Sequence, residues 1–145
     1  METTKTPAAR STTTVQRTGA IFQEAGASLV LREAFFGVKR FDDFQRALGI
    51  SRSVLARRLK YLVEAGILER RKYQSRPDRF EYRLTDSGLE LYPIFLAMKE
   101  WGEKWLGDDA PPVVLHHETC GHDCVPRVTC DRCGERVHAK EMTYR

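Results

Sequence analysis

The chain has 145 residues, of which 41% are hydrophobic and 30% charged, and this composition predicts a soluble domain with short extensions. It excludes a large multi-domain enzyme, and no apolar run approaches the roughly 18 residues that a membrane-spanning helix requires. Met1 to Thr14 lack the apolar stretch of a secretory signal, so we expect a cytoplasmic protein without a membrane partner.

Positive charge is concentrated in one segment. The net charge is only +4, yet residues 51–83 contain ten basic and four acidic residues, so the rest of the chain is slightly negative. Such a basic patch favours a polyanionic partner, although a solvated surface without any partner can have the same composition.

The N-terminal part of the chain predicts a tail followed by helices. Residues 1–14 are rich in Thr, Ala and Ser, which is typical of a disordered tail. Residues 15–36 predict two helices, and the second is apolar nearly all round, which implies burial. Gly37 then ends this second helix.

Residues 40–66 predict two short helices joined by a tight turn at Gly49. Ser51 is suited to cap the second of these helices, and Gly66 ends it. Leucines recur at helical spacing in the second helix and predict a buried stripe. These are Leu55, Leu59 and Leu62. The organisation is that of a helix-turn-helix.

Basic and hydroxyl side chains of this second helix lie away from the leucine stripe. They are Ser53, Arg57 and Lys60, with Arg52 beside them. A positive face on a helix that is held by its opposite face is what insertion into the major groove of DNA requires.

Residues 67–84 predict a β-hairpin whose turn contains Pro77 and Asp78. Arg76 lies at its tip, and the strands carry further cations at Arg70, Lys72, Arg79 and Arg83. A hairpin directly after a recognition helix is called a wing, and its basic residues would reach phosphates or the adjacent minor groove.

Thr85 is expected to cap a long helix that runs to about Leu106, with Pro93 indicating a kink or a shifted start. Apolar residues spread around more than one face of this helix. One face would pack on the winged core, and the other on a dimer mate or on the first helix of the same subunit. Residues 107–112 read as a linker, and residues 113–145 form a Cys- and His-rich extension.

The four cysteines of the chain all lie in this extension, at Cys120, Cys124, Cys130 and Cys133. In a reducing compartment clustered cysteines more often bind metal than form disulfides, so we expect a structural zinc ion. His117 is an alternative fourth ligand to Cys124, because it would form a His-x2-Cys arm with Cys120. Disulfides and redox-sensing thiols stay open as alternatives.

Several uncommon sequence elements occur in order at the right spacing over about residues 15–106, and there the chain resembles the HxlR-type winged-helix transcriptional regulators. The likeness includes Leu31-Arg32-Glu33, Gly49-Ile50-Ser51, Glu64-Ala65-Gly66 and the strand end at Leu84-Thr85. The extension, with Cys130-x2-Cys133-Gly134-Glu135, is similar to one found in a subset of that family.

The resemblance implies a mainly α fold with a small β-hairpin (α+β), a winged helix-turn-helix that dimerises through its N- and C-terminal helices and carries a metal-binding tail. It implies a homodimer that binds an inverted repeat in double-stranded DNA. The expected DNA-contacting residues are Arg40, Ser51, Arg52, Ser53, Arg57, Arg58, Lys60, Arg70, Lys72, Arg76 and Arg79.

Two other functions remain as alternatives at this point. A winged-helix protein-interaction module would share the fold, and a zinc enzyme would need an open metal site with Glu118 or Glu135 as acid–base group. Family members often carry a sensing cysteine before the first helix, but Ser11 to Thr14 occupy that place here. The effector, whether a small molecule, a metal or an oxidant, is therefore left open.

Overall fold

The computed structural model describes residues 8–107 and 113–143, with side chains from Thr14 onward. The chain forms two compact units, Met1–Leu89 and Glu90–Arg145, which we describe separately. None of the helices in the described ranges is both long enough and apolar enough to cross a membrane. Residues 108–112 of the expected linker lie outside the described residues.

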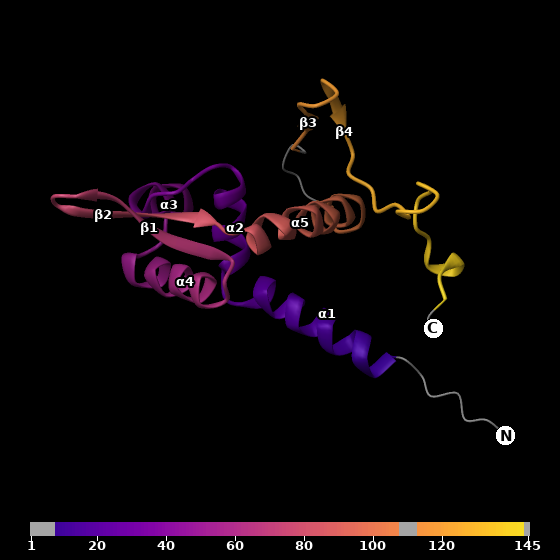
Figure 1. Cartoon of the computed structure of the whole chain (residues 1–145), viewed down its shortest axis with the longest axis horizontal. Helices are drawn as coiled ribbons and strands as arrows, with labels where there is room; N and C mark the ends of the chain where they lie inside the picture. Colours follow the sequence, from indigo (N-terminus) through magenta and orange to yellow (C-terminus); the bar gives the residue numbers. More distant parts are fainter. Residues whose placement is uncertain (1–7, 108–112, 144–145) are drawn as a thin grey trace. The chain divides into compact units, whose positions relative to one another are not determined.

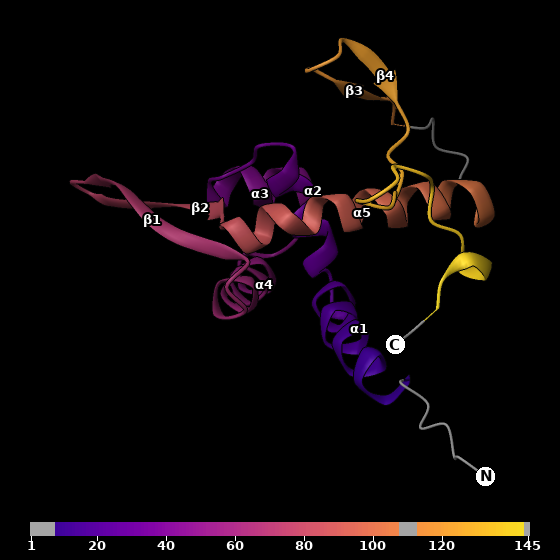
Figure 2. The same ribbon diagram turned by 45° about the vertical axis from the view of Figure 1, so that its right-hand side comes forward.

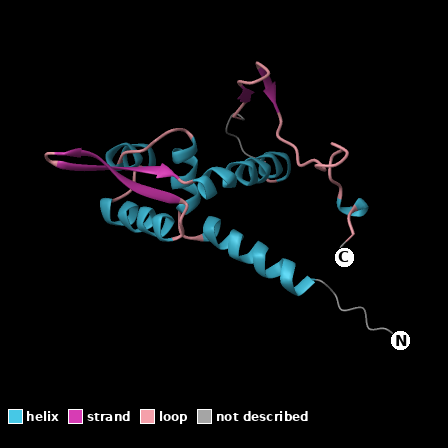
Figure 3. Ribbon diagram, viewed as in Figure 1, coloured by secondary structure: helices cyan, strands magenta, loops and turns pink. Residues whose placement is uncertain are grey.

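The first unit has the order helix, helix, helix, helix, hairpin (Figure 1). Its elements are α1 (Ala8–Gln23), α2 (Ala27–Phe35), α3 (Phe41–Leu48), α4 (Arg52–Glu64), β1 (Leu68–Ser75) and β2 (Asp78–Leu84). Figure 3 shows that helices make up most of this unit and that the hairpin is its extended part. The predicted α+β winged helix-turn-helix is confirmed.

Helix α1 begins earlier than the sequence indicated. Residues 8–14 were expected to be disordered, but α1 starts at Ala8. Ala and Arg are among the strongest helix formers, and the sequence Ala8-Ala9-Arg10 places them at the start of this helix. The composition of the segment, which is rich in Thr and Ser, concealed this local preference.

The core of the first unit forms where α2, α3 and α4 meet. Its fully buried large side chains are Val30, Leu31, Phe44, Leu55, Leu59, Leu62 and Leu68. The expected burial of the second helix nearly all round is wrong, because Leu29 of α2 and Phe36, the residue that follows its last turn, stay 42% and 63% exposed in the chain. Helix α2 therefore turns only one face to this core.

The hairpin pairs antiparallel from Leu68 opposite Leu84 to Ser75 opposite Asp78, with one irregularity between Lys72 and Gln74. It extends away from the three helices of the core in both Figure 1 and Figure 2. A short segment before α3 adds to its base, because the Tyr82 N–H donates to the Lys39 carbonyl at 2.7 Å. We call residues 68–84 the wing.

Helix α5 (Asp86–Trp105) follows the wing and crosses the division between the two units. The Thr85 hydroxyl caps it by accepting a hydrogen bond from the Gly88 N–H at 3.1 Å. Pro93 lies inside the helix, so the helix continues through it. The second unit also contains β3 (Leu115–His117), β4 (His122–Cys124) and the 3-10 turn η1 (Ala139–Glu141).

The first turn of α5 depends on a close backbone approach at Gly88. A Cβ atom added there would collide with the Ile67 carbonyl oxygen. We therefore expect Gly88→Ala to lower the free energy of unfolding by about 1–3 kcal/mol, the usual cost of overpacking. Chemical denaturation of the purified variant measures this loss.

The matched control is Gly102→Ala in the same helix, where nothing lies within 4 Å of the added atom. Replacing this interior glycine should raise stability by roughly 0.5–1 kcal/mol. Equal effects of the two substitutions would show that helix propensity, and not the contact with Ile67, decides the outcome.

Candidate nucleic-acid interface

Helix α4 presents a polar face because its other face is buried. The Ser51 hydroxyl caps the helix by accepting from the Val54 N–H at 3.3 Å, as predicted. Leu55, Leu59 and Leu62 are fully buried, and they turn Ser53, Arg57 and Lys60 outward, where all three are exposed. The leucine stripe thus determines which side chains reach an external ligand.

Arg52 is held at the start of α4 by residues of α3. Its guanidinium donates to the Asp42 carboxylate at 3.1 Å and lies 4.6 Å from the centre of the Phe41 ring. The Arg52 side chain nevertheless stays 69% exposed. The contacts with Asp42 and Phe41, which both belong to α3, restrict the rotamers of the Arg52 side chain and thereby position its guanidinium. Asp42 and Phe41 were not recognised from sequence, because only the tertiary approach of α3 to α4 brings them to Arg52.

Arg58 does not lie on this face, contrary to the expectation from sequence. Its guanidinium packs against Gly26 at the junction of α1 and α2, where a Cβ atom would collide with it. The Nε and Nη1 atoms of Arg58 are buried and have no hydrogen-bond partner among the described residues. The physical reason is helical rotation, because a step of one residue turns the side chain away from the direction of Arg57.

The cations on the strands of the wing are engaged by neighbouring side chains. The guanidinium of Arg70 stacks on the Phe80 ring at 3.6 Å, and Lys72 forms an ion pair with Asp78 at 2.8 Å. Arg40, which lies beside the wing, is 4.7 Å from the Tyr73 ring centre. Each of these cations therefore already interacts with an aromatic ring or a carboxylate of the wing.

The cations near the tip of the wing are different. Arg76 and Arg79 are exposed, and no ion pair or hydrogen bond of their side chains is found among the residues that the structure describes. The same holds for Arg57 on α4. The wing and α4 thus carry exposed positive charges that form no ion pair within the described part of the chain, which suits them to a partner with phosphates.

A buried carboxylate fixes the base of the wing and was missed from sequence. Glu81 is only 7% exposed, and Arg83 pairs with it at 2.6 Å. The backbone of Glu81 also forms a β-bridge with Arg40. Charged and aromatic residues alternate along β2, which indicates a strand, but this pattern does not indicate that the Glu81 carboxylate is buried.

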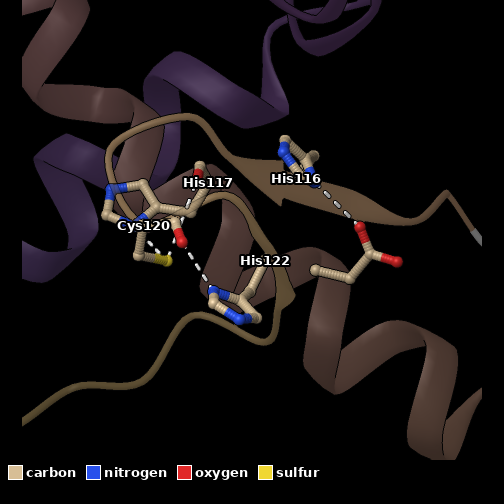
Figure 4. Close-up of polar contacts among 5 residues, drawn as sticks. His116, His117, Cys120 and His122 are labelled. Carbon is tan, nitrogen blue, oxygen red and sulfur yellow. Dashed lines mark hydrogen bonds and ion pairs between the residues drawn. The ribbon is translucent and has the colours of Figure 1, made fainter.

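The extension brings its metal-type side chains together in two pairs. The Cys120 sulfur lies 3.4 Å from Nδ1 of His117 (Figure 4). Cys130 is hydrogen-bonded by Cys133, and backbone N–H groups of Cys133 and Arg132 hold the pKa of the Cys130 thiol below its ordinary value. Within residues 8–107 and 113–143 no group of three or more such donors is close enough to hold a metal ion. All four cysteines are free thiols.

The fold is a winged helix-turn-helix in which α4 has an exposed basic face and the wing is basic. These features define the class of DNA-binding transcriptional regulators. Within that class, residues 23–110 match the HxlR-like helix-turn-helix family, and the chain belongs to this family. The expected family membership is therefore confirmed for the winged part.

Similar proteins agree with this assignment. An HTH-type transcriptional regulator of Mycobacterium tuberculosis (strain ATCC 25618 / H37Rv) is 46% identical over 116 residues, which are 79% of this chain and 73% of that protein. An HTH-type regulator of Synechocystis sp. is 41% identical over 83 residues, 57% of this chain and 62% of its own length. Both relatives are named as transcriptional regulators of the helix-turn-helix type.

Solved structures show the same fold. PA1607, described as a candidate transcription factor, superposes with a TM-score of 0.77 at 32% identity and covers 90% of this chain and 92% of its own. The reduced form of the transcriptional regulator YodB from B. subtilis has a TM-score of 0.57 at 27% identity, with 62% of this chain and 89% of its own covered. The chain is thus a helix-turn-helix transcriptional regulator that binds DNA.

Proposed function

We propose that the chain binds an inverted-repeat operator as a homodimer, with α4 of each subunit in the major groove and the wing on the backbone or the adjacent minor groove. The observation that carries this proposal is the exposed polar face of α4, with Ser53, Arg57 and Lys60 opposite its buried leucine stripe. Arg76 and Arg79 on the wing supply further charges whose side chains have no ion pair with any residue that the structure describes. Ser51, Arg52, Arg40, Arg70 and Lys72 would add positioning contacts.

Exposed apolar side chains on α5 support the dimer. Ile94, Met98, Trp101 and Trp105 are 44%, 50%, 59% and 64% exposed in the single chain. A monomer rarely leaves so many large apolar side chains on one helix in water, and a symmetric partner is the commonest way to cover them. Val15 on α1, which is 69% exposed, is suited to the same contact.

We also propose that the extension binds a structural zinc ion and that the protein works in the cytoplasm. Thiolate and imidazole groups are the donors that zinc prefers, and the extension contains both. Its described side chains are almost all exposed, so it has little apolar core of its own, and a bound metal would supply the missing stability.

Selection of genomic fragments by the purified protein at about 0.15 M salt, followed by sequencing, tests the proposal for DNA. Enrichment of one or a few inverted repeats is the expected result, because two subunits related by a two-fold axis read two half-sites. Weak binding without sequence preference would contradict it and favour a winged-helix protein-interaction module instead.

Arg57→Ala should weaken binding to the selected operator by roughly 1–3 kcal/mol, as expected when a side chain that contacts a base edge is lost. Fluorescence anisotropy with the operator and with a random duplex of the same length measures the effect. The loss should be confined to the operator. Equal losses on both duplexes would place Arg57 on the phosphate backbone.

Arg76→Ala should instead weaken binding to both duplexes and reduce the slope of log K against log salt by about 0.9, the value for one phosphate contact. Arg58→Met is the matched control, because the Arg58 guanidinium is packed against Gly26 and should contribute nothing to this slope. A wild-type slope in Arg76→Ala, or a reduced slope in Arg58→Met, would reverse these two assignments.

A further inference from the structure

The first donor pair of the extension lies in a tight turn that closes at a glycine. Residues 117–121 form this turn, in which the Gly121 N–H donates to the His117 carbonyl at 2.8 Å. Gly121 has a φ of 69°, a left-handed conformation that favours glycine. The residue after it, His122, then pairs with His117 across β3 and β4.

The second donor pair repeats this arrangement position by position. The Gly134 N–H donates to the Cys130 carbonyl at 2.8 Å, and Gly134 has a φ of 76°. The residue after it, Glu135, accepts a hydrogen bond from the Cys130 N–H at 2.8 Å. Both turns therefore have the form donor-x-x-donor-Gly, followed by a residue that pairs with the first donor.

A turn of this form places its two donors on the same side of a narrow loop, and zinc ribbons hold a tetrahedral ion with two such arms. We propose that one zinc ion per chain is bound by His117, Cys120, Cys130 and Cys133, and that Cys124 is not a ligand. This assignment rests on the proposed zinc binding by the extension, and it selects the fourth ligand that the spacing alone leaves open.

The two histidines that flank the first turn contact other groups through their Nδ1 atoms. Nδ1 of His116 lies 3.0 Å from the Asp123 carboxylate, and Nδ1 of His122 lies 2.6 Å from the Cys120 carbonyl oxygen. His117 is the histidine of this turn whose ring nitrogen lies next to the Cys120 sulfur (Figure 4). The contact with Cys120 and the place of His117 as the first donor of the turn therefore assign the imidazole ligand. Contacts at Nδ1 do not prevent a histidine from binding metal through Nε2. His116 and His122 are left out because they lie outside the repeated turn.

Cys124 lies outside the repeated turn. It pairs with Leu115 at the far end of β3 and β4, two residue pairs away from the turn that holds Cys120. The turn that supplies Cys120 closes at Gly121, so Cys124 has no place in the donor-x-x-donor-Gly arrangement that the two turns share.

The two turns are not yet joined around one centre, since no three donors among the described residues lie together. Because zinc requires all four ligands, its binding would draw the turns together and order the segment between them. Metal removal should therefore loosen the extension while leaving α2, α3, α4 and the wing intact, because the first unit has its own buried core.

X-ray absorption of zinc in the purified wild-type chain tests the assignment without any substitution. We expect one zinc ion per chain, with three sulfur ligands at about 2.3 Å and one nitrogen ligand at about 2.0–2.1 Å. Four sulfur ligands and no nitrogen would overturn the assignment in favour of Cys124. A protein that contains no zinc after expression in zinc-supplemented medium would overturn the metal site altogether.

Matched variants give a second readout. Competition with a chromophoric chelator should show that Cys124→Ser and His116→Asn keep wild-type zinc affinity. His117→Asn and Cys130→Ser should lose more than the roughly 10–100-fold that removal of an outer-shell partner costs. Retained affinity in His117→Asn together with a loss in Cys124→Ser would contradict the assignment.

These measurements separate the two proposals, because they are made without DNA. Hydrogen exchange of the zinc-free wild-type chain should show faster exchange in residues 113–143 and unchanged exchange in α2 to β2. Loss of protection throughout α2 to β2 would contradict the independent core of the first unit. Failure to select an inverted repeat would contradict the operator proposal and leave the zinc ligands unaffected.

Discussion

Burial of one leucine stripe on α4 is the constraint on which the proposed DNA-binding surface depends. Leu55, Leu59 and Leu62 are fully buried, so the rotation of α4 about its axis is fixed. Each buried leucine contributes about 1.5–3 kcal/mol relative to exposure, which is far more than any one exposed ion pair contributes. The side chains that face outward, Ser53 and Arg57 among them, are a consequence of this packing.

The wing divides its positive charge between two tasks. Arg70 and Lys72 contact Phe80 and Asp78 and thereby stiffen the two strands against each other. Arg76 and Arg79, near the turn, have no such contact among the described residues. The base is held by the buried Glu81 and its partner Arg83. A stiff stem with free charges near its end loses little conformational entropy on binding, which favours affinity.

The sequence predicted most of the fold because local signals and packing agree. Gly49 and Gly66 adopt the positive φ expected of residues that end helices, and Ser51 and Thr85 cap α4 and α5 through their hydroxyls. The start of α1 was wrong because a Thr-rich composition outweighed the helix formers Ala8-Ala9-Arg10.

The candidate site was predicted less completely, because the type of a residue does not decide whether its side chain faces solvent or packs against the protein. Arg57 and Arg58 are neighbours with the same charge, yet one is exposed and the other is packed against Gly26. Helical periodicity indicates that they differ, but the approach of the α1–α2 junction decides what Arg58 meets. The contacts of Arg52 with Asp42 and Phe41 likewise arise from the packing of α3 on α4.

In the extension, too, the spacing of residues along the sequence does not decide which side chains act together. Cys-x3-Cys and His-x2-Cys are both acceptable arms for zinc, so residue types and counts leave Cys124 and His117 equivalent. The backbone distinguishes them, because Gly121 and Gly134 close two turns with the same hydrogen bond at 2.8 Å. His117 and Cys120 lie inside one of these turns, which sets their direction before any metal arrives, whereas Cys124 lies two residue pairs beyond it, opposite Leu115. Preorganised donors therefore favour the ligand set in which the two turns are equivalent.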